Sequence, residues 1–422
     1  MFLYCLRNRQ YRRKKGSIML DARTIEVIKS TVPVLEVHGQ TITTQFYQMM
    51  FKNHPELLNI FNHANQRQGK QSAALANAVY AAAAHIDRLE EILPVVKGIA
   101  QKHRALGIMP EHYPIVGQNL LAAIKTVLGD AATDEIMDAW SQAYGVIADV
   151  FISVEAEMYQ EAEQKVGGWR GFRRFVVERK VKESDVITSF YLKPEDGGEI
   201  ATYQPGQYIT VRVKPEGQEF THLRHYSLST SPGHAYYRIS VKREDAVGNQ
   251  PAGVVSVHLH DKVKEGDVLD ISAPAGDFTL DQSKSCPVVL LSGGVGLTPM
   301  ISMLETLLTS SDKRDVVYIH AARCGSHHAM KEHVEQLTND HADQLRSYHV
   351  YEAPAAGESC HKTGFIDLPW LQTVANNNAD FYFCGPTPFM KAINHALKKW
   401  GVPDDRIHFE FFGPASSLNN EG

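Results

Sequence analysis

Three short motifs in the C-terminal half of the chain combine residue types that suit flavin and nicotinamide chemistry. Arg224-His225-Tyr226-Ser227 offers a cation for a phosphate, a flat ring for stacking and a hydroxyl for a ring nitrogen. Gly293-Gly294-Val295-Gly296-Leu297-Thr298-Pro299 follows an apolar run, and Cys384-Gly385-Pro386 comes later. This order suggests a flavin site that receives electrons from a nicotinamide site.

The glycine-rich segment has the setting of a pyrophosphate-binding turn. Such a turn joins a buried strand to a helix, whose first N–H groups meet the negative charge. However, Pro299 stands where the dinucleotide fingerprint has its third glycine, and no acidic residue is clearly placed for the ribose. Taken alone, the loop fits a plain tight turn equally well. Cys384-Gly385-Pro386 favours a nucleotide site, because ligands of parallel sheets bind at the carboxyl ends of strands.

A histidine in the N-terminal third of the chain suggests a second redox centre. His103 shares an apolar helical stripe with Val95, Ile99 and Leu106, in an alanine-rich and glycine-poor segment. A histidine in this position is usually a core residue that bonds to a carbonyl. It can also bind haem iron through its neutral imidazole.

The residue patterns predict three folded domains after a basic N-terminal extension at 1–18. Residues 19–166 show helical periodicity and predict an all-α domain, while Gly167-Gly168 begins a region of short β-branched and aromatic runs. We expect residues 167–283 to form an antiparallel β-barrel, with strands at 172–177, 187–192, 208–213 and 236–241. Residues 284–422 predict a parallel α/β domain, with strands at 288–291, 316–320 and 381–384 and helices at 300–308 and 390–400.

The composition is that of an ordinary soluble protein. The 422 residues are 43% hydrophobic and 22% charged, with a net charge of −5, which predicts no general attraction to nucleic acid. The five cysteines are widely spaced and form no C-x-x-C pair, which argues against a disulfide framework and a zinc site. No run is long enough to span a membrane. We expect a cytoplasmic monomer, and the basic extension is either disordered or lies upstream of the true start at Met19.

The order of the R-x-Y-S, G-x-G-x-T-P and C-G-P motifs resembles that of ferredoxin-reductase-like flavoenzymes between residues 167 and 414. The resemblance implies that FAD contacts Tyr208 and Arg224 to Ser227, with Ser256 near its pyrophosphate. It implies that Gly293 to Pro299 and Cys384-Gly385-Pro386 hold NADH or NADPH, a choice that the sequence leaves open. Glu410-Phe411-Phe412-Gly413-Pro414 would cover the other flavin face, with Glu410 tuning the flavin's environment and Phe412 as the stacking ring.

The helical region is similar to a globin, because a phenylalanine, a tyrosine and a polar and apolar pair precede His103. From Met19 to Pro414, the chain resembles the bacterial flavohaemoglobins, which are nitric oxide dioxygenases. The resemblance implies that His103 ligates the iron of haem b, that Lys102 precedes it as expected, and that Tyr113 and Glu155 form the pair behind it. It places Tyr47, Gln71 and Leu75 in the distal pocket and Phe61 against the haem.

The resemblance implies an enzyme that converts nitric oxide and O2 to nitrate, with electrons passing from NAD(P)H through FAD to haem. A carboxylate and phenol behind the imidazole would favour O–O chemistry over reversible storage. Two alternatives remain. The chain could be a haem-based sensor whose reductase keeps the iron ferrous, or a flavin or ferric reductase with an inert helical domain.

Overall fold

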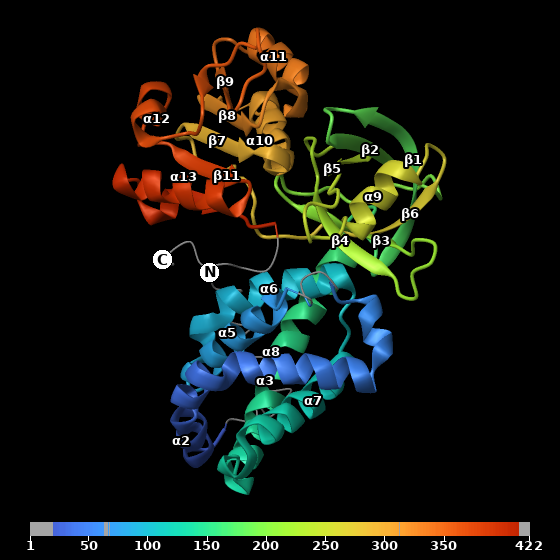
Figure 1. Ribbon diagram of the computed structural model, residues 1–422, viewed down its shortest axis with the longest axis vertical. Helices are drawn as coiled ribbons and strands as arrows, with labels where there is room; N and C mark the ends of the chain where they lie inside the picture. Colours follow the sequence, from blue (N-terminus) through green and yellow to red (C-terminus); the bar gives the residue numbers. More distant parts are fainter. Residues whose placement is uncertain (1–19, 63–65, 67, 312, 413–422) are drawn as a thin grey trace. The chain divides into compact units, whose positions relative to one another are not determined.

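The computed structural model describes residues 20–62, 66, 68–311 and 313–412 (Figure 1). These residues form two compact units. The first comprises 20–56, Gln66–Ala100 and Met109–Glu157, and the second comprises 57–62, Gln101–Ile108 and 158–412. Within the described ranges, no helix combines the length and apolar content that a membrane crossing requires.

The N-terminal region is entirely helical, as the periodicity predicts. It contains α2 (Ala22–Ser30), α3 (Val32–Asn53), α5 (Lys70–Ala84), α6 (Leu93–Leu106), α7 (His112–Leu128) and α8 (Asp134–Gln164), with short 3-10 turns η1 (Pro55–Asn59), η2 (Leu89–Ile92) and η3 (Gly129–Ala131). The Asp21 side chain caps α2 by accepting a hydrogen bond from the Thr24 N–H at 2.8 Å. The core of this helical region buries Ile28, Phe46, Met50 and Ile124.

Helices α6 and α8 contribute residues to both units. The first part of α6 belongs to the helical unit, whereas Gln101–Ile108 belongs with the second unit. The end of α8 follows the same division after Glu157. The turn that carries His103 is therefore part of the second unit.

An antiparallel sheet of six strands follows the helices. Its strands are β1 (Phe172–Lys182), β2 (Ile187–Pro194), β3 (Tyr208–Val213), β4 (His222–Ser227), β5 (Tyr237–Lys242) and β6 (Val268–Ser272), in the order β4-β3-β6-β1-β2-β5. A bridge between Leu228 and Ile239 joins the two outer strands and closes the sheet into a barrel. Helix α9 (Val254–Asp261) packs Val255 and Leu259 into the barrel core.

The C-terminal region is a parallel sheet in the order β10-β9-β8-β7-β11-β12. Its strands are β7 (Val288–Gly293), β8 (Val316–Ala322), β9 (Leu345–Tyr351), β10 (Lys362–Thr363), β11 (Asp380–Cys384) and β12 (Ile407–Phe409). Its helices are α10 (Leu297–Thr309), α11 (Lys331–Asp340), α12 (Leu368–Val374) and α13 (Thr387–Lys399). Three 3-10 turns complete it: η4 (Gly294–Gly296), η5 (Gly325–His327) and η6 (Asp404–Arg406). Figure 1 shows α10 and α11 on one side of the sheet and α12 and α13 on the other. Alternate residues of β7 pack on each side, Leu290 toward α10 and Leu291 toward α13. The predicted fold class is confirmed in all three regions.

Candidate functional site

The predicted flavin motif lies on β4, which pairs with β3. The register places Tyr208 opposite Ser227 and Thr210 opposite His225. Tyr208 and Ser227 are buried, while His225 is exposed and its Nδ1 lies 2.8 Å from Thr210 Oγ1. Because side chains alternate along a strand, Arg224 and Tyr226 lie on the opposite face from His225 and Ser227.

Helix α9 begins beside the same sheet and supplies a candidate phosphate site. Gly253 caps it, and the first-turn N–H groups of a helix have no partner within that helix. Ser256 Oγ accepts a hydrogen bond from the Glu244 N–H at 3.2 Å. A Cβ at Gly253 would come within 2.6 Å of that hydroxyl, so a larger residue there would require the Ser256 side chain to rotate. The open N–H groups suit a pyrophosphate.

The predicted nicotinamide loop joins β7 to α10 as expected. Gly294 has a positive φ of 53°, which favours glycine. Thr298 Oγ1 donates to the Val295 carbonyl at 3.1 Å and stabilises the turn. Pro299 is the third residue of α10, where the missing N–H removes no helical hydrogen bond. The proline is therefore compatible with a helix N-terminus.

Cys384-Gly385-Pro386 ends β11, next to this loop. β11 pairs with β7, and Cys384 lies opposite Ser292. A Cβ at Gly296 would lie 2.1 Å from the Cys384 carbonyl oxygen, so the two segments are in close backbone contact. Burial raises the pKa of the Cys384 thiol, which is fully enclosed. The two predicted motifs thus form one surface at the carboxyl ends of neighbouring strands.

The predicted C-terminal segment follows β12. Phe411 is half-buried against the α/β core, and the Phe412 side chain is 49% exposed. Glu410 is also half-buried. Burial raises the pKa of Glu410 to about 7, with Asp277 adding to the effect and Lys102 opposing it. Gly413 and Pro414 lie outside the described residues.

The raised pKa of Glu410 predicts a pH-dependent effect of the Glu410→Gln substitution. The folded chain holds the Glu410 proton more strongly than the unfolded chain does. Stabilisation by the neutral form is therefore complete below the ordinary glutamate pKa of 4.5 and is lost as the pH rises through about 7. We expect the free energy of unfolding of Glu410→Gln to exceed that of the original chain by about 1–3 kcal/mol between pH 5 and pH 8. Denaturant unfolding of the cofactor-free chain measures the difference. The exposed Glu332→Gln should show no such trend, and a flat difference for Glu410→Gln would contradict the prediction.

In the helical unit, Tyr113 and Glu155 form the predicted pair. The Tyr113 hydroxyl donates to Glu155 Oε1 at 2.6 Å, and Glu155 is only 3% exposed. The Tyr144 hydroxyl donates to the Tyr113 carbonyl at 2.6 Å and helps to hold the start of α7. Separately, His103 lies half-buried in the last turn of α6, and its carbonyl accepts a hydrogen bond from the Ile108 N–H at 2.9 Å. Lys102 precedes it on the same turn.

The predicted distal residues lie on two facing helices, α3 and α5. Tyr47 is buried on α3, where burial raises the pKa of its phenol and a hydrogen bond with Gln71 of α5 opposes that shift. Gln66 Nε2 donates to Gln71 Oε1 at 2.8 Å and orients that amide. Leu75 lies half-buried one turn after Gln71. Phe61 follows η1 as part of the second unit, where it is half-buried.

Comparisons with known proteins agree with this division of the chain. Three family models match: a globin at residues 44–151, an oxidoreductase FAD-binding domain at 174–280 and an oxidoreductase NAD-binding domain at 290–395. A flavohemoprotein of Bacillus thuringiensis is 59% identical over 405 residues, which is 95% of this chain and 100% of the relative. The flavohemoprotein of Bacillus subtilis is 52% identical, with 95% and 99% covered.

The chain belongs to the flavohemoprotein family. Among solved structures, a flavohemoglobin of Malassezia yamatoensis with bound FAD and haem matches with a TM-score of 0.79 at 25% identity, covering 93% of this chain and all of that one. The FAD/NAD-binding domain of a nitric oxide dioxygenase from Vibrio cholerae matches with a TM-score of 0.53 at 40% identity, covering 58% of this chain and all of that one. The expected family and its haem, FAD and NAD cofactors are confirmed.

The side chains of this flavohemoprotein suit those cofactors. Among the described residues, the buried Tyr208 hydroxyl has no hydrogen-bond partner, as expected of a group that bonds a ligand. A Cβ at Gly296 would collide with the backbone at the end of β11. The nicotinamide loop therefore approaches β11 at a position without a side chain. In the helical unit, the hydrogen-bonded phenol and carboxylate of Tyr113 and Glu155 are groups of a kind that haem sites use, and the imidazole of His103 in the second unit is of the type that ligates haem iron.

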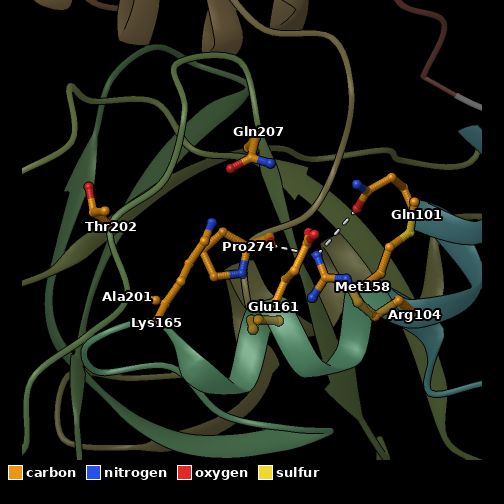
Figure 2. Close-up of a pocket in the computed structure, with 11 residues that line it drawn as sticks. Gln101, Arg104, Met158, Glu161, Lys165, Ala201, Thr202, Gln207 and Pro274 are labelled. Atoms are coloured by element: carbon orange, nitrogen blue, oxygen red, sulfur yellow. Dashed lines mark hydrogen bonds between the residues drawn. The ribbon is translucent and has the colours of Figure 1, made fainter. Parts of the chain in front are cut away.

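The structure shows a contact of Arg104, the residue after His103, that has no signal in the sequence (Figure 2). Arg104 is 7% exposed, and its Nη2 donates to the Pro274 carbonyl of the barrel at 2.6 Å. It lines a cavity of about 60 Å³. A cavity of this size holds about two water molecules and is too small for a nucleotide cofactor. The adjacent Ala105 packs against Tyr208, a predicted FAD contact.

Proposed function

We propose that this flavohemoprotein is a nitric oxide dioxygenase, which combines nitric oxide and O2 into nitrate with electrons from NAD(P)H and so removes nitric oxide. The observation that carries the proposal is the hydrogen bond between the half-buried Tyr113 and the buried Glu155. A carboxylate–phenol pair is suited to raise the basicity of a haem ligand, which favours reaction of O2 over storage. The Vibrio cholerae protein, which is described as a nitric oxide dioxygenase, supports the same reductase chemistry.

The reaction balances with the cofactors of the family. Two molecules of nitric oxide and two of O2 give two nitrate ions, while one NAD(P)H becomes NAD(P)⁺ and one proton is released. When bound, NAD(P)H supplies a hydride, FAD divides it into single electrons, and haem iron is the centre at which the two gases react.

We assign roles to the residues accordingly. His103 holds the iron, and Glu155 keeps the Tyr113 phenol oriented, since its carboxylate is buried and accepts that hydrogen bond. Tyr208 and the residues of β4 position the flavin, and the first turn of α9 with Ser256 binds its pyrophosphate. Gly293 to Pro299 and Cys384-Gly385-Pro386 bind the nicotinamide nucleotide. Glu410, Phe411 and Phe412 would cover the opposite flavin face, and Lys102 opposes part of the rise that burial causes in the pKa of Glu410.

In the distal pocket, we propose that the Tyr47 hydroxyl donates a hydrogen bond to O2. Gln71 bonds that hydroxyl and limits its orientations, and Leu75 contributes apolar surface. Phe61 is proposed separately as the ring that packs against the haem. We expect the three domains to span 19–166, 167–283 and 284–422, and the matched family models lie within these bounds. We also propose a cytoplasmic monomer.

Tyr47→Phe is expected to raise the rate of O2 dissociation by about tenfold to 150-fold. The reason is the loss of one charge-assisted hydrogen bond, worth about 1.5–3 kcal/mol. Stopped-flow mixing of the oxygenated, reduced protein with an O2 scavenger measures this rate. Tyr80→Phe is a matched control because Tyr80 is exposed on α5. An unchanged rate in Tyr47→Phe would remove Tyr47 from this role.

The overall proposal is tested by a nitric oxide pulse to the purified protein with NADH in air. We expect rapid loss of nitric oxide, formation of an equal amount of nitrate and half that amount of NADH consumed. Tight gas binding without nitrate would support a sensor instead. A purified chain that lacks a Soret band but reduces flavin with NADH would support a flavin or ferric reductase.

A further inference from the structure

A buried carboxylate joins the two nucleotide-binding regions of the second unit. Glu305 lies on α10, and its Oε2 accepts hydrogen bonds from Thr230 Oγ1 and the Ser231 N–H, both at 2.7 Å. Its Oε1 lies 3.2 Å from Arg238 Nη2 and 2.9 Å from His333 Nε2. Each carboxylate oxygen therefore has two partners, three of them from the barrel and one from α11.

Burial makes this cluster costly to break. The side chains of Glu305 and Arg238 are 12% and 9% exposed. Burial alone would raise the pKa of Glu305, but the contacts with His333, Arg238, Thr230 and Ser231 outweigh it and lower the pKa to about 2. The carboxylate is thus charged at neutral pH. Removing that charge leaves a buried guanidinium without its counter-ion.

The partners of Glu305 continue directly into the two predicted cofactor sites. Thr230 and Ser231 follow the flavin motif, which ends at Ser227 on β4. Arg238 also bonds the Ser229 carbonyl, and the Ser229 N–H donates to the Arg238 carbonyl at 2.8 Å. On the other side, α10 starts at the nicotinamide loop and extends to Glu305 as one helix. One carboxylate thus connects the end of the flavin motif with the helix that carries the nicotinamide loop.

We propose that Glu305 is a positioning residue for hydride transfer, which holds the nicotinamide loop at a fixed distance from the flavin strand β4. The proposal rests on the reductase half of the proposed function. In the step concerned, one hydrogen nucleus and two electrons leave the reduced nicotinamide and arrive at the flavin, while Glu305 gains and loses nothing. A small displacement of the two sites slows such a step, because hydride transfer requires close contact between the rings.

Glu305→Gln tests the proposal, because glutamine keeps the shape of the side chain and removes its charge. Anaerobic stopped-flow mixing of the FAD-loaded protein with NADH should show hydride transfer slowed by about tenfold to a hundredfold at saturating NADH. FAD content should be unchanged. In the cofactor-free chain, the Ser231 amide should exchange its hydrogen faster, since its acceptor at 2.7 Å is weakened. A purely stabilising role would lower the melting temperature but leave the rate of the folded protein unaltered.

Two further variants complete the experiment. Glu332→Gln removes an exposed carboxylate from α11 and should change neither the rate nor the exchange. Thr230→Val removes a single hydrogen bond to Glu305 and should slow hydride transfer by a smaller factor. If Glu305→Gln does not fold, this variant tests the positioning role by itself. Faster Ser231 exchange with an unchanged hydride-transfer rate, in either variant, overturns the proposal. Failure of NADH to reduce FAD in the unaltered protein would instead contradict the proposed reductase function.

Discussion

Replacement of His103 by alanine is expected to yield a purified protein without haem that still binds FAD and reduces it with NADH. The imidazole is the proposed iron ligand, and alanine offers no atom that can replace it. The flavin and nicotinamide residues lie on β3, β4, α9, β7 and β11, none of which contains the substituted side chain. Pyridine haemochrome content per FAD measures the result, and we expect at least a tenfold loss.

A second histidine variant separates ligand loss from unfolding. His38→Ala removes an exposed imidazole from α3 and should retain full haem content. His103→Gly should recover a Soret band when imidazole is added to the solution, because the added ring can occupy the space of the missing one. Normal haem content in His103→Ala would contradict the assignment of this residue.

Gly296→Ala is expected to slow the reduction of FAD by NADH strongly while both FAD and haem remain bound. The added Cβ would lie 2.1 Å from the Cys384 carbonyl oxygen and 2.7 Å from the Gly385 nitrogen, and both are backbone atoms that cannot rotate away. The loop or the end of β11 must therefore move, at a cost of about 1–3 kcal/mol in stability. Since both segments form the proposed nicotinamide site, the rate of FAD reduction at low NADH should fall by at least about tenfold.

Gly145→Ala is the matched control for this substitution. Gly145 lies in α8 with no atom near the position of an added Cβ, so alanine there should stabilise the helix by up to about 1 kcal/mol. FAD reduction should be unchanged in that variant. If Gly296→Ala reduced FAD at the normal rate, the loop would not be the nicotinamide site.

Local patterns predicted most of the architecture. The strand expected at 208–213 matches β3, and those expected at 288–291, 316–320 and 381–384 lie within β7, β8 and β11. Two strands of the barrel were not predicted. β4 contains two histidines, an arginine and a serine, so few of its six residues have the β-branched or apolar side chains that predict a strand. β6 has only five residues, and pairing with β1 and β3 stabilises it more than its own composition does.

Sequence patterns pointed to candidate sites only where the chemistry depends on residues that are adjacent in the chain. The flavin motif and the two nicotinamide motifs are each contiguous in the sequence, and the glycines of the nicotinamide motifs indicate the backbone conformation that these turns need. In contrast, the contacts of Glu305 and Arg104 join residues far apart in the sequence. Such contacts produce no recognisable periodicity or spacing in the sequence, because they form only when separate elements pack together. The roles of all the candidate site residues stay predictions, and the experiments above address those of His103, Tyr47 and the nicotinamide loop.

The anchoring of Arg104 to the Pro274 carbonyl limits how this protein can be dissected. A truncated gene product that ends near Gly167 would retain His103 but lose the acceptor on which the neighbouring guanidinium depends. It would also uncover Ala105, which packs on Tyr208 in the full chain. An isolated fragment of this kind should therefore have a frayed carboxyl end on α6, the helix that bears the proposed iron ligand, so its spectra and affinities should differ from those of the intact polypeptide.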